Sequence, residues 1–356
     1  MEAILLVGGQ GSRLRPLTIS TPKPLLPMAG VPMLEHQLTR ARAAGVDRIV
    51  FATSYRAEMF TEAFGDGERL GLEIVYMTED VPLGTAGAIR NAADALTCGA
   101  DAAVLVLNGD ILSGHDISAQ VGVHEKADAS VTLHLTIAED ARRYGSVPTD
   151  SAGRVIDFVE KSADPPTNQV NAGCYVFRRS VIDRIPTGRV VSVEYETFPG
   201  LLADGQVVLG YVESAYWLDV GTPAAFVRGT CDLVLGAMPS QAVGSSSHGA
   251  LLLDGAVVHS NAQVHGGTTV GARARVDSGA FVEASVLFDG AVVESEARVV
   301  RSVVGRGARI CAGAVLDDVV VGDGAIVGSG NELQGGLRLW PGVELPPTAV
   351  RFSHDT

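Results

Sequence analysis

The chain has few cysteines and no long hydrophobic run, which argues against several large functional classes. Its four cysteines are scattered over positions 98, 174, 231 and 311, without the spacing of a metal site. They predict reduced thiols in a cytosolic protein. No apolar run reaches the roughly 18 residues that a membrane helix needs. Because no basic segment precedes the first apolar residues, the amino terminus predicts a buried strand rather than a signal peptide.

Positive charge is also scarce, and the charge balance argues against a nucleic-acid partner. The chain has 27 lysines and arginines against 41 aspartates and glutamates, for a formal net charge of −14. An acidic surface repels a phosphate backbone. A small phosphorylated substrate is still compatible with this composition, because a few basic residues can act locally inside an acidic protein.

The residues that are abundant predict two domains with sizeable cores. The chain has 356 residues, 46% of them hydrophobic, and its 42 glycines favour tight turns and repeated coils. In the first half, apolar runs alternate with helical patterns, which is typical of a parallel α/β sheet; between about 128 and 220 the pattern is that of a mixed sheet. The expected strands include 3–7, 48–52, 73–77, 102–107, 131–137, 173–177 and 207–212, and the expected helices are 34–44, 58–64 and 87–96.

A six-residue period begins after a linker-like segment and predicts a different second domain. One bulky and one small inward position in each hexad describe a prism-shaped parallel β-helix, with three hexads in a coil of about 18 residues and four or five coils in all. The predicted division is a first domain at 1–235, a linker at 236–250, and a β-helix with a C-terminal cap at 251–356. The bulky positions are Val258, Val264, Val270, Val276, Val282, Phe288, Val293, Val299, Val304, Ile310, Leu316, Val321 and Val327.

The strongest local signal is a glycine-rich turn directly after the first expected strand. Gly8, Gly9 and Gly11 permit a close backbone approach and can aim amide groups at an anion. The turn is neither a Walker A motif, since no Gly-Lys-Ser/Thr follows, nor the dinucleotide fingerprint, since Arg13 and the leucine after it stand where a third glycine is needed. Arg13 and Lys23 offer a guanidinium fork and an ammonium group to phosphate oxygens. Together these residues predict a phosphate-binding loop.

The run from Gly8 to Lys23 resembles the signature of sugar-1-phosphate nucleotidyltransferases, and the resemblance spans nearly all of the chain. Within that family the sequence is most similar to mannose-1-phosphate guanylyltransferases of the actinobacterial type. The resemblance implies a Rossmann-like nucleotidyltransferase domain with a mixed central sheet, then a left-handed β-helix, and a homo-oligomer. It also implies that a nucleoside triphosphate, with GTP favoured, reacts with a sugar 1-phosphate and releases pyrophosphate. Further motifs that carry it are LGTAG at 83–87, NGD at 108–110, EK at 160–161, NAG at 171–173 and WLDVGT at 217–222.

Two aspartates each follow a run of apolar residues. Asp110 follows the strand at 102–107 and Asp219 follows Tyr-Trp-Leu, and α/β sheets bind ligands at the carboxyl ends of parallel strands. Taken alone, Asp110 could cap a helix and Asp219 could occupy a turn. The resemblance assigns both to Mg²⁺, which prefers one or two carboxylates together with substrate phosphate oxygens.

The resemblance also assigns the other site residues, with Arg13 and Lys23 in catalytic roles. A sugar 1-phosphate already carries an anionic oxygen near neutral pH, so no general base is needed, and catalysis depends on positioning and electrostatics. Without the resemblance, the favoured interpretation of Glu160 is a surface partner of Lys161. The nucleotide would be bound by Leu6, Gly8, Gly9, Gly11, Ser12, Arg13, Glu79, Gly84, Thr85 and Asp110, and the sugar phosphate by Lys23, Gly145, Glu160, Lys161 and Asn171.

Several alternatives stay open at the level of sequence. The acceptor could be glucose 1-phosphate, a heptose phosphate or a cyclitol phosphate, and the nucleotide could be UTP or dTTP. Hexapeptide β-helices also occur in acyltransferases, for which His259 and His265 are the histidines inside the coils. A non-catalytic regulatory subunit is a third alternative, although the charged residues of the site are all present. The tail around Trp340 could cover the β-helix or contact another subunit.

Overall fold

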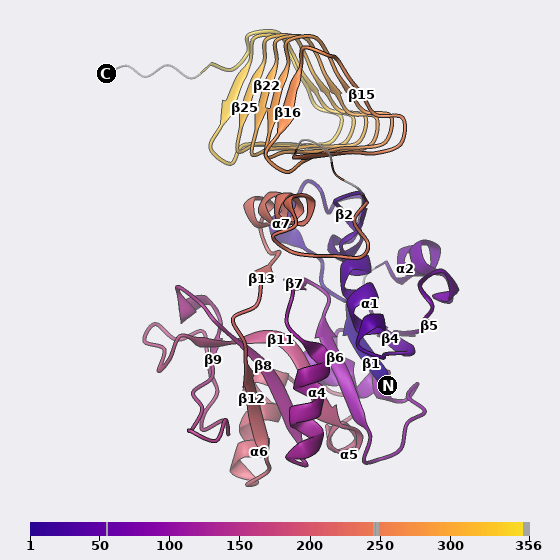
Figure 1. Cartoon of the computed structure of the whole chain (residues 1–356), viewed down its shortest axis with the longest axis vertical. Coiled ribbons are helices and arrows are strands. Elements are labelled where there is room, and N and C mark those ends of the chain that lie inside the picture. Colours follow the sequence, from indigo (N-terminus) through magenta and orange to yellow (C-terminus); the bar gives the residue numbers. More distant parts are fainter. Residues whose placement is uncertain (55, 245, 247–248, 352–356) are drawn as a thin grey trace. The chain divides into compact units, whose positions relative to one another are not determined.

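The computed structural model describes residues 1–54, 56–244, 246 and 249–351, which fall into two compact units (Figure 1). The first unit comprises Met1–Gly9 and Gln37–Trp217, and the second comprises Gln10–His36 and Leu218–Thr356. The segment 10–36 therefore groups with the carboxyl-terminal part of the chain rather than with the strand that precedes it. Residues 245, 247 and 248 of the expected linker lie outside the described residues.

The first unit is built on a nine-stranded mixed sheet. Its strands are β1 (Glu2–Leu6), β4 (Arg48–Thr53), β5 (Glu73–Thr78), β6 (Ala103–Asn108), β8 (Val131–Ile137), β9 (Gly145–Ser146), β10 (Val159–Glu160), β11 (Gln169–Arg178) and β12 (Val208–Val212). Four of them run parallel in the order β6-β1-β4-β5, with Ile4 opposite Val106 on one side and Val50 on the other. Strand β11 is antiparallel to β6 and carries β8 and β9. The predicted mixed α/β sheet is confirmed.

Helices cover the sheet of the first unit where apolar residues recur at helical spacing. They are α1 (Met33–Ala43), which begins before Gln37, α2 (Ala57–Phe64), α3 (Gly84–Ala93), α4 (Ile117–Lys126), α5 (Arg179–Asp183) and α6 (Phe198–Ala203). Ile89 of α3 and Phe198 of α6 are fully buried in the same core as Ile4. Helix α3 begins three residues before the expected helix at 87–96, because Gly84, with a φ of 75°, turns the chain into it.

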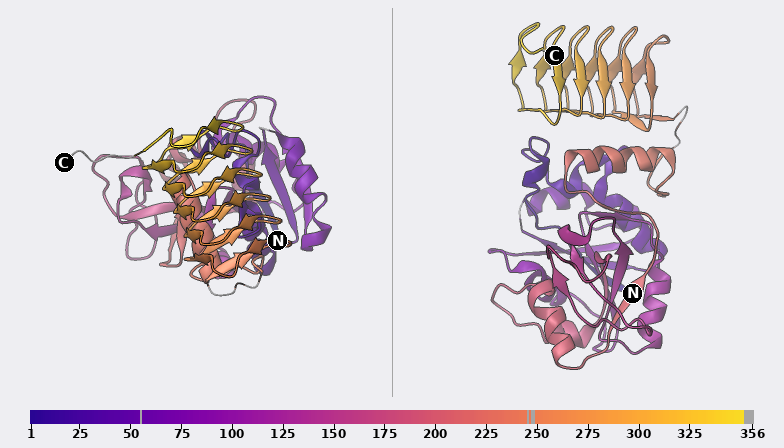
Figure 2. Two further views of the ribbon diagram at one scale, coloured as in Figure 1. Left: turned by 90° about the horizontal axis from the view of Figure 1, so that it is seen from above. Right: turned by 90° about the vertical axis from the view of Figure 1, so that its left-hand side faces the viewer.

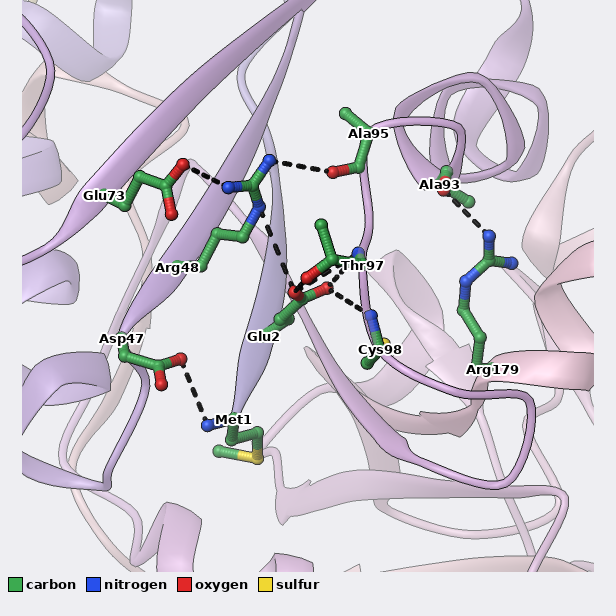
Figure 3. A network of polar contacts seen from close by, with 10 residues as sticks. All are labelled: Met1, Glu2, Asp47, Arg48, Glu73, Ala93, Ala95, Thr97, Cys98 and Arg179. Carbon is green, nitrogen blue, oxygen red and sulfur yellow. Dashed lines mark hydrogen bonds and ion pairs between the residues drawn. The ribbon is translucent and has the colours of Figure 1, made fainter.

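The edge at which the parallel strands begin is tied together by polar contacts around Glu2 (Figure 3). The Glu2 carboxylate accepts hydrogen bonds from the N–H groups of Thr97 and Cys98 and from the Thr97 hydroxyl. The Nε of Arg48 lies 4.0 Å from the same carboxylate, and the Arg48 guanidinium donates to the carbonyl of Ala95 at 3.1 Å. Burial by itself would raise the pKa of Glu2, but the hydrogen bonds from Thr97 and Cys98 outweigh it and lower that pKa.

The second unit contains a three-sided parallel β-helix, whose strands are stacked coil on coil in Figure 2. The strands are β14 (Ala250–Leu252), β15 (Val257–Val258), β16 (Gln263–His265), β17 (Thr268–Val270), β18 (Arg275–Val276), β19 (Phe281–Glu283), β20 (Val286–Leu287), β21 (Val292–Val293), β22 (Arg298–Val300), β23 (Val303–Val304), β24 (Arg309–Ile310), β25 (Val315–Asp317), β26 (Val320–Val321), β27 (Ile326–Val327), β28 (Glu332–Gln334), β29 (Arg338–Leu339) and β30 (Glu344–Leu345). They form three parallel sheets, β14-β17-β20-β23-β26-β29, β15-β18-β21-β24-β27-β30 and β16-β19-β22-β25-β28. The described residues thus make five complete coils and two strands of a sixth, consistent with a left-handed β-helix.

Large and small side chains fill the interior of the β-helix as the six-residue period predicts. Val304, Ile310 and Ala308 of one coil are fully buried. Gly305 follows the inward valine directly because a Cβ there would lie 2.6 Å from the backbone nitrogen of Asp323 in the next coil. Each coil therefore presses its backbone against its neighbour at this corner, and only glycine fits.

The prediction that Phe288 occupies an inward position of the β-helix is wrong. Leu287 rather than Phe288 pairs with Val270, because the strand of this coil arrives one residue sooner than the period requires. Phe288 is still buried, since its ring meets that of Phe226 edge-on with centroids 6.2 Å apart. Phe226 belongs to α7 (Pro223–Leu235), which follows β13 (Trp217–Asp219). Helix α7 thus covers the sheet of the β-helix that contains β20.

The segment 10–36 of the second unit consists of short elements: η1 (Ser12–Leu14), η2 (Lys23–Leu25), β2 (Pro27–Met28) and β3 (Val31–Pro32). The two strands form an antiparallel pair whose turn contains Gly30, where a Cβ would lie 2.7 Å from a methyl group of Leu253. His36 contacts the carbonyl of Met28 at 3.0 Å and the hydroxyl of Ser240 at 2.8 Å. Among the described helices of the chain, none is both long and apolar enough to cross a membrane.

Candidate active site

Close packing around Gly11 sets the shape of the glycine-rich turn. Gly11 has a φ of 59°, and a Cβ there would lie 2.9 Å from the Cβ of Lys23 and 3.1 Å from Cγ2 of Thr18. The Thr18 hydroxyl donates to the carbonyl of Gly11 at 2.9 Å. The structure therefore brings Lys23, which is 7% exposed, against the turn. Ser12, at the start of η1, is exposed.

The first glycines of the turn belong to the first unit. Gly8 and Gly9 are exposed. They come shortly after Leu6, the last residue of β1. The Ser54 hydroxyl donates to the carbonyl of Gly8 at 2.8 Å, and a Cβ on Gly8 would lie 2.6 Å from that hydroxyl. A side chain at this position would therefore displace the turn from the end of β4.

Arg13 lies against the segment that carries Asp219. A Cβ on Gly221 would lie 3.0 Å from Nη2 and 3.1 Å from Cζ of Arg13, so the bare glycine leaves room for the guanidinium. Gly221 comes two residues after Asp219, which ends β13 and is half-buried. Within the second unit, the expected phosphate-binding loop therefore adjoins the segment that holds one of the two expected metal ligands.

Asp110 stands at the carboxyl end of a parallel strand in the first unit. It follows β6 through Gly109, whose N–H donates to the carbonyl of Leu6 at 2.9 Å. A Cβ on Gly109 would lie 2.6 Å from that same carbonyl oxygen. Glycine is therefore required for the chain to pass this close to the end of β1, and the half-buried Asp110 follows directly.

Three of the residues expected around the sugar phosphate lie together. Gly145 of β9 pairs with Glu160 of β10, and a Cβ on Gly145 would lie 2.7 Å from Oε2 of Glu160. The Nζ of Lys161 lies 3.1 Å from Oε1 of Glu160, which is the surface pairing that the sequence left open. Lys161 has a φ of 48°, a left-handed conformation that is uncommon for a lysine.

Asn171 has its side chain largely committed to the protein. Its Nδ2 donates to the hydroxyl of Tyr175 at 2.9 Å, and its Oδ1 accepts from the N–H of Gly173 at 3.1 Å. The register of β11 against β8 shifts between Asn171 and Tyr175, and the strand begins at Gln169, four residues before the expected start at 173. The preceding residue, Val170, pairs with Ser146 of β9, so Asn171 lies at the same end of the sheet as Gly145.

Glu79 follows β5 and has one carboxylate oxygen bonded within the protein and one that is buried. Its Oε2 accepts from the N–H of Leu83 at 3.2 Å, whereas Oε1 is buried and has no hydrogen-bond partner among the described residues. Burial raises the pKa of this carboxyl. A Cβ on Gly84 would lie 2.6 Å from the carbonyl of Val191. The Glu79 side chain and the start of α3 thus form one local structure.

The hydroxyl of Thr85 is engaged inside the protein. It donates to Glu194 and accepts from the N–H of Val193, both at 2.8 Å. These bonds fix the π-helical turn Val193–Thr197 against α3. If Thr85 contacts the nucleotide as expected, it does so through atoms other than its hydroxyl hydrogen.

Several residues that build the site were missed by sequence reasoning. Gln37 of α1 donates from Nε2 to the carbonyls on both sides of the Gly109–Asp110 pair, at 3.2 Å to Asn108 and 2.5 Å to Ile111. Trp217 donates from its indole N–H to the carbonyl of Ala172 at 3.0 Å. Gly221 stood inside a quoted motif but received no role. For Gln37 no local pattern signals the contact, because its partners lie on a different element.

Comparison with known proteins identifies the family. The family model described as "Nucleotidyl transferase" matches residues 2–234, and the one described as "GMPPB C-terminal domain" matches residues 248–339. The chain belongs to the nucleotidyl transferase family. The predicted membership is thereby confirmed, and this nucleotidyltransferase is an enzyme of that family.

Named relatives cover most or all of the length of this nucleotidyltransferase. The mannose-1-phosphate guanylyltransferase of Mycobacterium tuberculosis is 50% identical over 356 residues, which is 100% of this chain and 98% of the relative. Mannose-1-phosphate guanylyltransferase 1 of Arabidopsis thaliana is 34% identical over 312 residues, 87% of this chain and 82% of the relative. Among solved structures, HddC from Yersinia pseudotuberculosis has a TM-score of 0.55 at 26% identity and covers 64% of this chain and 97% of its own. A putative glucose-1-phosphate thymidylyltransferase from Bacillus anthracis has a TM-score of 0.59 at 25% identity, with 65% and 94% coverage.

Nucleotidyltransferases of this family generally use a divalent metal ion. The hard carboxylate oxygens of Asp110 and Asp219 fit such an ion, because magnesium is usually bound by one or two carboxylates and completes its shell with water and phosphate oxygens. In the described part of the chain, no group of three or more histidine, cysteine, aspartate or glutamate side chains could hold a metal. Asp110 lies in the first unit and Asp219 in the second, so their convergence on one ion stays a prediction.

Proposed function

We propose that this chain forms GDP-mannose from GTP and mannose 1-phosphate in the presence of Mg²⁺. In the reaction, a phosphate oxygen of the sugar phosphate attacks the α-phosphorus of GTP, the bond from that phosphorus to the α–β bridging oxygen breaks, and pyrophosphate leaves. The observation that carries the proposal is the contact of Arg13 with Gly221, which joins the glycine-rich loop to the segment of Asp219. The full-length relative from M. tuberculosis supports the choice of substrates.

The roles of the side chains follow from their charges and positions. The backbone N–H groups of residues 8–11 and the exposed guanidinium of Arg13 hold the β- and γ-phosphates, which leave together as pyrophosphate. Lys23, packed against Gly11, neutralises charge on the reacting phosphates. Lys161 holds the sugar phosphate, and Glu160 accepts hydrogen bonds from sugar hydroxyls. Bound to Asp110 and Asp219, Mg²⁺ would supply neutralisation of the α-phosphate charge.

Glu79 supports guanine as the base. Guanine presents adjacent N–H donors on its Watson–Crick edge, and a carboxylate can accept from both, whereas uracil and thymine offer only one N–H between two carbonyl oxygens. The buried Oε1 of Glu79, with no partner among the described residues, is an acceptor of the required kind. Selectivity of this kind can be large, because a base without the second donor leaves a buried acceptor unpaired.

A pyrophosphate-release screen tests the proposal. GTP, UTP, dTTP, ATP and CTP are each paired with a panel of sugar and cyclitol 1-phosphates, and we expect GTP with mannose 1-phosphate to give the highest kcat/KM. Asp110→Asn and Asp219→Asn should each lower kcat by at least about a hundredfold, while Asp101→Asn, an exposed aspartate before β6, serves as the control. Retained turnover in either of the first two variants would reject the metal assignment. A higher kcat/KM with another pair would reject the substrates.

Two further variants separate the competing assignments. Glu79→Gln should lower the preference for GTP over UTP by about tenfold or more, because an amide offers one acceptor and one donor to the base. The acyltransferase alternative relies on His259 and His265, of which the first is exposed against Asn261 and the second lies 3.8 Å from Glu283. Acetyl transfer to an amino-sugar phosphate that is lost on His259→Ala would favour that alternative.

Assembly into a homo-oligomer is also part of the proposal. Val257 and Trp340 of the β-helix expose 59% and 48% of their surface, which gives this domain apolar area that a second copy would cover. Sedimentation analysis of the full chain tests this, and a monomer at micromolar concentration would contradict it.

A further inference from the structure

The β-helix contacts the backbone of the glycine-rich loop directly. Arg338, in the sixth strand of the sheet that α7 covers, donates from Nη1 to the carbonyls of Arg13 and Arg15, each at 2.8 Å. A single guanidinium nitrogen thus holds both carbonyls that flank Leu14. All four residues belong to the second unit, so the contact is internal to one compact body.

A second group of contacts lies on the two preceding coils of the same sheet. Arg306, just after β23, donates from Nη1 to the hydroxyl of Thr21 at 3.3 Å, and the hydroxyl of Ser20 donates to Asp323 at 3.2 Å. Asp323 also accepts from the N–H of Arg306 at 2.8 Å, and their side chains form an ion pair at 3.8 Å. We call the contacts of Arg306, Asp323 and Arg338 with residues 13–21 the loop brace.

The loop depends on this support because much of it is exposed. Ser12, Arg13, Arg15 and Ser20 are all exposed, whereas Leu14, Leu17 and Thr18 between them are buried. Bonds inside the loop include that of the Thr18 hydroxyl to the Gly11 carbonyl. The brace holds the backbone on both sides of Leu14 and the hydroxyls of Ser20 and Thr21, and so helps to keep the Arg13 guanidinium against Gly221.

We propose that the β-helix is part of the triphosphate-binding machinery, with Arg338 as a positioning residue for Arg13. The inference rests on the proposed function, in which Arg13 holds the β- and γ-phosphates. Its physical basis is that a charged donor fixes two neutral carbonyls at normal hydrogen-bond length, which is stronger than a neutral contact. A displacement of about 1 Å in a phosphate-holding group is enough to lower turnover substantially.

The position of the brace predicts which kinetic constants change. Arg338 acts on the loop that holds the leaving pyrophosphate. The sugar phosphate is held elsewhere, by Glu160 at the end of β10 and by Lys161, which follows it. Loss of Arg338 should therefore raise KM for GTP and lower kcat, and leave KM for mannose 1-phosphate nearly unchanged. If Arg338 had a merely structural role, its loss would raise KM for both substrates together or would only lower the melting temperature.

The experiment compares Arg338→Ala, Arg338→Lys and Arg309→Ala in the full chain. Arg309 is an exposed arginine on a different sheet of the same β-helix, where it pairs with Glu294, and it serves as the matched control. Hydrogen exchange of the amides of residues 10–22 is measured beside steady-state kinetics. We expect Arg338→Ala to speed that exchange and to raise KM for GTP by about tenfold, Arg338→Lys to restore part of both, and Arg309→Ala to change neither.

The outcomes separate the brace from the proposed function. Unchanged exchange and an unchanged KM for GTP in Arg338→Ala would overturn the inference, and so would faster exchange with no kinetic effect. Equal losses in Arg338→Ala and Arg309→Ala would also overturn it. If the wild-type chain turned over no substrate pair, the proposed function would fail, and the brace would be judged on exchange alone: faster exchange in Arg338→Ala supports the contact, and equal exchange rejects it.

Discussion

Gly221 shows how a residue without a side chain sets the position of a charged one. A Cβ at this position would reach within 3.2 Å of three guanidinium atoms of Arg13. That guanidinium is the end of a flexible side chain, so it can move aside at little cost to folding. We expect Gly221→Ala to lower kcat/KM for the nucleotide about ten- to a hundredfold, with a nearly unchanged melting temperature. Steady-state kinetics with varied GTP, together with thermal melts, measure both quantities.

The control for this substitution is Gly99→Ala, since nothing lies within 4 Å of a Cβ built on Gly99. The control should match the wild-type chain in both activity and melting temperature. Full activity in Gly221→Ala would show that the position of Arg13 is unimportant for the reaction, whereas a large drop in melting temperature would show that the glycine is needed for folding instead.

Two stacked histidines contribute to the dependence of stability on pH. The rings of His115 and His134 lie 3.8 Å apart, and burial, the largest cause, lowers their pKa values to about 2 and about 3. At pH values below 6.5, the ordinary pKa of histidine, the unfolded chain binds protons at these positions while the folded chain does not. The contribution of these two histidines to stability is therefore fully present above pH 6.5 and is lost progressively as the pH falls from 6.5 toward 2 to 3.

His134→Leu is expected to reduce this acid sensitivity. Both ring nitrogens of His134 have no hydrogen-bond partner among the described residues, so leucine removes a titrating group without breaking a hydrogen bond. At about 1.4 kcal/mol per pKa unit, one histidine contributes roughly 2 kcal/mol to the loss of unfolding free energy between pH 6.5 and 5. Urea denaturation at pH 7 and pH 5 measures the difference, and the exposed His259→Leu is the control. An equal loss in both variants contradicts the assignment.

At the scale of the element, the network around Glu2 holds the beginning of the parallel sheet. Glu2→Gln replaces a carboxylate that accepts from two backbone N–H groups and a hydroxyl. We expect the unfolding free energy to fall by about 1 to 3 kcal/mol. Because the folded-state pKa of Glu2 is lowered from 4.5, its contribution is present above that pH and disappears as the pH falls below it.

Denaturant unfolding at pH 7 tests the Glu2 prediction, and Glu62→Gln on α2, an exposed glutamate, is the control. The site residues follow the opposite ends of these strands, so kcat/KM at 25 °C should stay near that of the wild-type chain. A loss of activity without a loss of stability would mean that this edge of the sheet affects the reaction in a way that its contacts do not explain.

Sequence reasoning succeeded where a local pattern decides which side chains are buried. Strand β1, the parallel sheet and the hexads of the β-helix all follow from the period of apolar residues. It failed at Phe288, because the length of a coil depends on its corner and not on the hexad alone. It also missed Gln37 and Arg338, since their partners are distant: Arg338 and Arg13 are 325 positions apart. No local pattern contains such a contact.

At the scale of the whole molecule, residues 10–36 and α7 belong to the same compact unit as the β-helix. A chain that ends after Leu235 would expose Phe226, Val227 and Cys231 of α7, which are at most 7% exposed in the full chain, and would leave residues 10–36 without their partners. We expect this truncated protein to aggregate or to lack turnover altogether, because a large apolar patch is exposed. Size-exclusion chromatography and pyrophosphate release measure the result. A soluble, fully active fragment would contradict the grouping of 10–36 with the β-helix.

The stacking of coils makes the β-helix a spacer of fixed length. Phe288, whose ring meets that of Phe226 on α7, directly follows the third strand of its sheet, and Arg338 belongs to the sixth. Neighbouring strands are about 4.8 Å apart, so the two points of attachment are separated by roughly 14 Å. Excision of one whole coil between them would keep every hexad in register and still move the arginine by one strand spacing, out of reach of the carbonyls it binds. The number of coils thus fixes where Arg338 meets the loop that carries Arg13.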